Sequence, residues 1–120
     1  MANVQKTFAL VLGIVLLIIG LWGFFLPAQK GAILDLFGVN LFQSILHVIA
    51  GLFGIWVGIK GEGKGYNLSI GWIGIVLGVL GFIPGVDKML MDLLNINQSI
   101  TVLHLVIGIV SLLVAYAVKE

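Results

Sequence analysis

The chain consists of four long apolar segments separated by three shorter, more polar ones. The apolar segments cover about residues 5–26, 42–60, 66–83 and 98–118. A helix needs roughly 20 residues, within a range of about 17–25, to cross the hydrocarbon core of a bilayer. The segments are continuously apolar instead of alternating, and an open sheet cannot satisfy its backbone in lipid, so helices are favoured over strands. The pattern predicts an all-α integral membrane protein, a four-helix bundle with four crossings.

The three polar stretches are of two kinds. Residues 61–65, Gly-Glu-Gly-Lys-Gly, predict a tight turn between the second and third helices. Residues 27–40 and 84–97 are longer, begin with a proline and place apolar residues around one aspartate, Asp35 or Asp92. Proline ends a helix, and the mixed pattern is typical of a short helix that lies in the membrane interface. We expect one interfacial helix in each long connection.

The second half of the chain repeats the first. The stretch 40–51, Asn-Leu-Phe-Gln-Ser-Ile-Leu-His-Val-Ile-Ala-Gly, returns at 97–108 as Asn-Gln-Ser-Ile-Thr-Val-Leu-His-Leu-Val-Ile-Gly. Apolar matches are common in so apolar a chain, whereas matched Pro, Asp, Asn and His residues are not. We therefore predict a single transmembrane domain, residues 1–120, built from two tandem two-helix repeats, about 5–60 and 66–118. Repeats with two crossings each are related by an axis along the membrane normal.

Composition and charge support this class and exclude others. Hydrophobic residues make up 61% of the chain and charged residues 9%, unlike a soluble domain. A net charge of +1 without arginine leaves no basic surface for nucleic acid, and the absence of cysteine excludes disulfides and thiol chemistry. The lysines gather on the side of the two termini, which by the positive-inside rule places both termini in the cytoplasm. Those lysines are Lys6, Lys60, Lys64 and Lys119, against Lys30 and Lys88 on the other side.

Two further residue types have predicted structural roles. Asn40 and Asn97 precede the second and fourth apolar segments, where an asparagine side chain can cap a helix N-terminus. Glycines at helical spacing allow membrane helices to approach closely, and we expect packing roles for Gly51, Gly54, Gly58, Gly74, Gly78 and Gly108. His47 lies on the same helical face as Gly51, so it should point towards protein and not towards lipid.

His47 and His104 are the only histidines of the chain, and the duplication places them at one membrane depth. Three interpretations remain open. They could form a neutral structural pair, hydrogen-bonded to each other, to backbone, to Ser44 or Thr101, or to water. They could be the two axial ligands of a b-type haem between facing helices. They could also line a lipid, small-molecule or divalent-metal pocket with aspartates nearby.

Enzyme chemistry is disfavoured because the apolar segments contain no Asp, Glu or Arg, their only lysines, Lys6 and Lys60, stand at their ends, and no catalytic motif is present. The prediction is a non-enzymatic structural or accessory membrane protein, acting as a homo-oligomer or as a subunit of a larger membrane complex. The alternatives are a carrier of haem b, or another cofactor, ligated by His47 and His104, and an oligomeric transporter-like or lipid-binding unit.

Three short motifs add a family resemblance. They are Gly-Phe-Ile-Pro-Gly at 81–85, Leu-Phe-Gly-Val-Asn at 36–40 and His-x-x-x-Gly at 47–51 and 104–108. With these motifs the chain resembles a family of small four-helix prokaryotic membrane proteins that is known only as a domain of unknown function. The resemblance implies four crossings, a location in a prokaryotic plasma membrane and no established activity. One departure is Asn95, which stands where the first repeat has Gly38.

Overall fold

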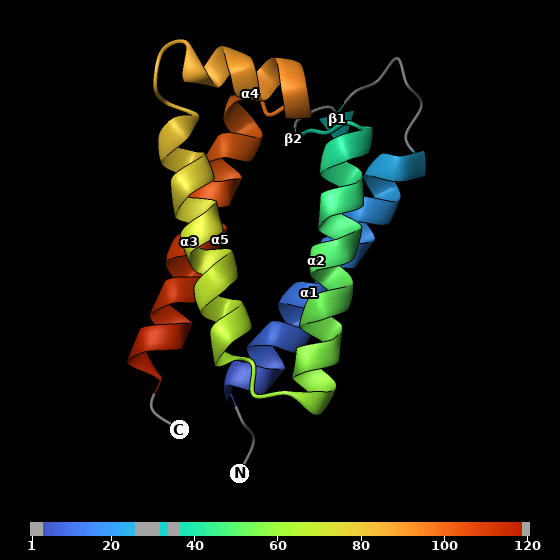
Figure 1. Ribbon diagram of the computed structural model, residues 1–120, viewed down its shortest axis with the longest axis vertical. Helices are drawn as coiled ribbons and strands as arrows, with labels where there is room; N and C mark the ends of the chain where they lie inside the picture. Colours follow the sequence, from blue (N-terminus) through green and yellow to red (C-terminus); the bar gives the residue numbers. More distant parts are fainter. Residues whose placement is uncertain (1–3, 26–31, 34–36, 119–120) are drawn as a thin grey trace.

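The computed structural model describes residues 4–25, 32–33 and 37–118. These residues form five α-helices and one two-strand ladder (Figure 1). In chain order the elements are α1 (Val4–Phe25), β1 (Ala32–Ile33), β2 (Phe37–Gly38), α2 (Leu41–Lys60), α3 (Lys64–Leu80), α4 (Val86–Leu94) and α5 (Gln98–Ala117).

The all-α prediction is confirmed, and the observed helices begin and end within a few residues of the apolar segments. Three of them, α1, α2 and α5, are long and apolar enough to cross a membrane, as expected for a membrane protein. The apolar helix α3 is shorter, at 17 residues, because it ends just before the turn that leads to Pro84.

The long helices are arranged as two pairs, α1 with α2 and α3 with α5 (Figure 1). The start of α1, the end of α5 and the α2–α3 turn lie at one end of the molecule, which we call the terminal end. The β1–β2 ladder and α4 lie at the opposite end, the connection end. Contacts between the two pairs are far fewer than contacts within them.

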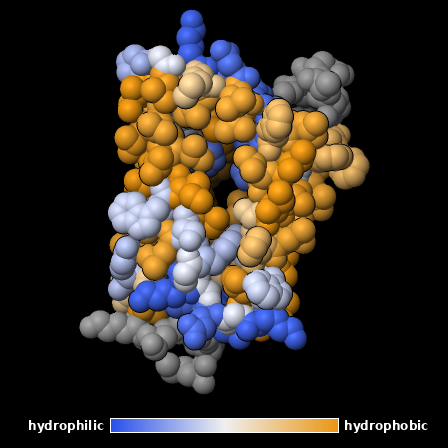
Figure 2. Space-filling view, viewed as in Figure 1, coloured by the Kyte–Doolittle hydropathy of each residue, from blue (hydrophilic) through white to orange (hydrophobic). Residues whose placement is uncertain are grey.

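Among the described residues, buried apolar side chains lie mainly in the terminal half and at the connection end of the molecule. Ala9, Leu12 and Ala115 lie in the terminal half, and a cluster of Leu90, Ile96 and Ile100 lies at the connection end. The outward surfaces of the helices are mostly apolar (Figure 2). An apolar surface of this extent requires an apolar surrounding, which a bilayer provides.

The two long connections differ from each other. The second contains the predicted short helix, α4, which begins after Gly85 and ends at Asn95 in the left-handed conformation (φ 55°, ψ 34°). In the first connection the prediction of a helix is wrong for the described residues, because β1 and β2 pair there as an antiparallel ladder, Ala32 with Gly38 and Ile33 with Phe37. Pro27 and Asp35 lie outside the described residues.

Gly38 provides a physical reason for the difference. It occupies the position that Asn95 holds in the second repeat, but it does not end a helix. Its α-carbon instead lies directly against the Asn95 carbonyl, where no side chain could fit. The backbone of the first connection therefore packs at Gly38 against the backbone of Asn95 in the second connection.

Candidate functional site

Glycines set the short distance between the helices of each pair. A methyl group added at Gly51 of α2 would lie 2.7 Å from the carbonyl oxygen of Gly13 in α1. A methyl group at Gly108 of α5 would lie 2.8 Å from the carbonyl oxygen of Gly71 in α3. Both distances are too short for a real side-chain atom, so backbone packs directly on backbone in the two pairs.

The other predicted packing glycines also face neighbouring residues at close range. An added methyl group would meet the Tyr66 hydroxyl at Gly54, Leu10 at Gly58, the His104 carbonyl at Gly74 and the Leu105 side chain at Gly78. The small-residue pattern therefore indicated positions of close helix contact, but only the tertiary structure shows which residue each glycine contacts.

Asn40 and Asn97 start α2 and α5 in the same way. The Oδ1 atom of Asn40 accepts a hydrogen bond from the Gln43 backbone N–H (2.8 Å), and that of Asn97 accepts one from the Ile100 N–H (3.0 Å). Each bond satisfies one of the free donors of a first helical turn. Asn40 also has a second role that the sequence did not predict, because its Nδ2 donates to the Leu93 carbonyl of α4 (2.9 Å).

A set of side-chain amides, the connection-end network, ties the two long connections together. Gln43 Nε2 donates to the carbonyls of Leu94 (2.8 Å) and Gly38 (3.0 Å). Asn95 Nδ2 donates to the Val39 carbonyl (2.8 Å). Together with the bond from Asn40, these contacts join the α1–α2 pair to the segment that follows α3.

A second set of amides joins the pairs at the terminal end. The fully buried Asn67 of α3 donates from Nδ2 to the backbone oxygen (3.0 Å) and to Oε1 (2.9 Å) of Gln5 in α1. Gln5 Nε2 in turn donates to the Val114 carbonyl of α5 (2.8 Å). Sequence reasoning missed Gln5, Gln43 and Asn67. The available signal was their position as uncharged amides at the borders of apolar segments.

His47 and His104 approach each other across the space between the two pairs. Their ring centroids are 6.5 Å apart, with the ring planes at 65°. The structure thus brings together the two residues that the duplication singled out, one from α2 and one from α5.

The histidine pair lacks the hydrogen bonds expected of a structural pair. Nδ1 of both imidazoles is enclosed and has no hydrogen-bond partner among the described residues. Ser44 Oγ also has none there, and Thr101 Oγ1 donates to the Asn97 carbonyl of its own helix (2.9 Å). The two enclosed nitrogens therefore retain an unused capacity to accept a hydrogen bond or to bind a metal.

No aspartate, glutamate or third histidine completes a metal-binding group with them within residues 4–25, 32–33 and 37–118. Asp92 is exposed on α4, and Asp35 lies outside the described residues. A carboxylate-assisted metal pocket is thus not assembled from the part of the chain that the structure describes.

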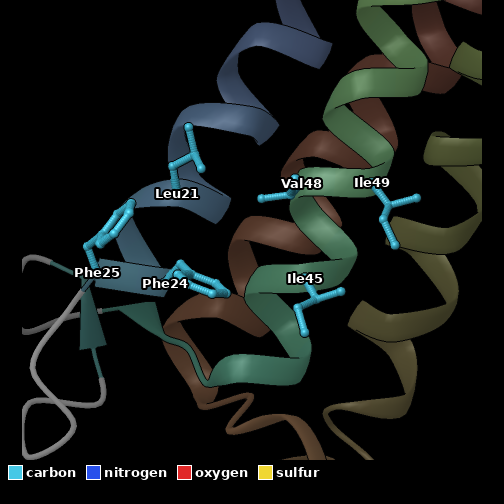
Figure 3. Close-up of a pocket in the computed structure, with 6 residues that line it drawn as sticks. All are labelled: Leu21, Phe24, Phe25, Ile45, Val48 and Ile49. Carbon is cyan, nitrogen blue, oxygen red and sulfur yellow. The ribbon is translucent and has the colours of Figure 1, made fainter.

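A separate apolar pocket of about 230 Å³ lies between α1 and α2 at the connection end (Figure 3). Figure 3 shows aromatic side chains from the end of α1 on one side and α2 side chains on the other. Its lining is entirely apolar and consists of Leu21, Phe24, Phe25, Ile45, Val48 and Ile49. Such a lining suits hydrocarbon and provides no polar group to select a ligand.

Comparisons with known proteins identify the family of the chain but give no information on its activity. Neither the curated proteins nor the solved structures yield a match to the chain. A family model does match, over residues 6–117, which is nearly the whole chain and includes both histidines and both capping asparagines. The protein therefore belongs to the family described as the domain of unknown function DUF4383.

Proposed function

We propose that the protein is a non-enzymatic, multi-pass membrane protein with a structural or accessory role. The observation that carries this proposal is how the buried side-chain amides are used. Gln5 and Gln43 donate to backbone carbonyls, and Asn67 donates to the backbone and side chain of Gln5. These bonds hold helices together, and the apolar pocket between α1 and α2 is lined by no acid, base or nucleophile among the described residues.

The membrane arrangement we propose has four crossings and two tandem hairpins. The corresponding contacts Gly13–Gly51 and Gly71–Gly108 support the repeat, because residues at equivalent positions make the same backbone contact in both pairs. At 17 residues, α3 falls at the lower limit for a crossing. With both termini in the cytoplasm, the connection-end network would face the outside of a prokaryotic plasma membrane.

The proposed partners are the lipid bilayer and either further copies of this chain or the other subunits of a larger membrane complex. Large apolar side chains are exposed on each of the four long helices, for example Trp56 (61% exposed) and Leu113 (60% exposed). Such surfaces can pack against lipid or against another membrane helix.

Purification from the native membrane in a mild detergent tests the accessory role. We expect a discrete assembly larger than one chain, detected by native mass spectrometry, whose composition is the same in two unrelated detergents. A single chain alone in both detergents and in lipid nanodiscs would contradict the proposal.

The distance between the histidines favours one second candidate, a carrier of haem b. Two axial imidazoles on one iron have ring centroids roughly 6 Å apart, since each metal–nitrogen bond is about 2 Å. The 6.5 Å observed is close to this. Visible absorption of protein expressed with excess haem tests the idea, and the absence of a Soret band would exclude it.

A further inference from the structure

We infer that His47 and His104 form a two-coordinate site for a bare monovalent metal ion, copper(I). The site consists of one imidazole from each helix pair, and its ligands are the two enclosed Nδ1 atoms, which make no hydrogen bond to a described residue. This inference goes beyond the structural or accessory role and does not depend on it.

The distance between the two rings fits a linear arrangement. An imidazole nitrogen lies about 1 Å from its ring centre and a metal–imidazole bond is about 2 Å, so a linear N–metal–N unit separates the ring centroids by roughly 6 Å. The observed 6.5 Å leaves room for an ion after a small inward movement of the two rings. The 65° angle between the planes is compatible, because linear coordination does not require the rings to be coplanar.

The number of ligands selects the type of ion. Zinc is almost always four-coordinate in proteins, and no third histidine or carboxylate accompanies the pair in the described part of the chain. Copper(I) has a filled d shell and accepts two ligands in a line, and imidazole is a suitable ligand for copper.

The charge of the ion also favours copper(I) over a divalent metal. The cost of moving an ion from water into an apolar interior increases with the square of its charge. Within the described part of the chain, a divalent ion here would have to be held by two neutral ligands without a carboxylate, since Asp87 and Asp92 are exposed at the connection end. A monovalent ion such as copper(I) carries the smallest charge of any metal ion, so its transfer from water into this site costs the least.

The position of the pair also favours a bare ion over haem. Gln43 lies four residues before His47, or about 6 Å along α2, and its side chain is bonded to the Leu94 carbonyl. A porphyrin extends from its iron in every equatorial direction and would reach this cross-connection. A bare ion occupies only the gap between the two nitrogens and has no ring that could reach Gln43.

The test is an anaerobic titration of the purified full-length protein, in detergent, with copper(I) and a chromogenic copper(I) chelator as competitor. We expect one copper(I) per chain. X-ray absorption of the loaded protein should show two nitrogen neighbours at about 2 Å and no sulfur. His47→Phe and His104→Phe should each reduce copper retention at least tenfold, with helix content checked by circular dichroism.

Two exposed methionines of α4, Met89 and Met91, provide the matched control, because thioethers also bind copper(I). The double variant Met89→Leu/Met91→Leu should keep the full copper content. Loss of copper in this variant, sulfur scattering in the wild type, or copper retention by both histidine variants would overturn the inference. A Soret band in the purified protein would assign the pair to haem instead. None of these outcomes bears on whether the protein forms the assembly expected of an accessory subunit.

Discussion

Gln43 in the first turn of α2 donates a hydrogen bond to the carbonyl of Leu94, the last residue of α4, over 2.8 Å. The two residues belong to opposite halves of the chain, and Gln43 is almost fully buried. The bond therefore fixes the helix pairs to each other at the end where both connections meet.

We predict that Gln43→Leu destabilises the connection end by about 1–3 kcal/mol, because the carbonyls of Leu94 and Gly38 each lose a buried donor. Hydrogen exchange measured by mass spectrometry should show faster exchange of the α4 amides. Gln98→Leu is the matched control, since Gln98 is exposed at the start of α5. Equal exchange in the two variants would show that the bond adds no stability.

A second prediction concerns the backbone contact within the first pair. Gly51→Ala should lower the thermal stability in detergent strongly, by at least the 1–3 kcal/mol typical of overpacking, because the new methyl group would lie 2.5 Å from the Leu17 backbone nitrogen. Gly65→Ala is the control. Nothing lies within 4 Å of a methyl group there, so this variant should be as stable as the wild type or slightly more so.

The histidines should contribute little to the stability of the metal-free protein. Nδ1 makes no hydrogen bond to a described residue in either ring, and phenylalanine keeps the contact between two flat rings. We expect His47→Phe/His104→Phe to change the unfolding free energy of metal-free protein by less than about 1 kcal/mol. A loss of several kcal/mol in chemical denaturation would instead show that the pair is a structural clasp.

The proposed orientation can be tested by labelling, because the native chain contains no cysteine. Lys88→Cys lies at the connection end and Lys64→Cys at the terminal end. A membrane-impermeant maleimide added to intact cells should label position 88 alone, and position 64 only after the cells are opened. Labelling of position 64 alone in intact cells would reverse the topology.

Much of the architecture follows from local sequence. Continuous apolar segments determined the helices, since a backbone in lipid must satisfy its hydrogen bonds within the segment. Asparagine before such a segment indicated the N-caps at Asn40 and Asn97, and small residues at helical spacing indicated where helices approach. These features depend on residues near one another in the chain, so periodicity and residue type are sufficient to find them.

The tertiary structure decided what these local features contact. Only the fold shows that Gly38 lies against Asn95 and forms a ladder where a helix was expected, or that Gln5 and Asn67 meet over 62 positions of sequence. It also shows that the ring centroids of His47 and His104, whose equal depth was inferred from the repeat, lie 6.5 Å apart, and that neither Nδ1 is bonded to a described residue. A sequence repeat relates positions by symmetry, but the distance between symmetry-related side chains depends on how the two helix pairs pack.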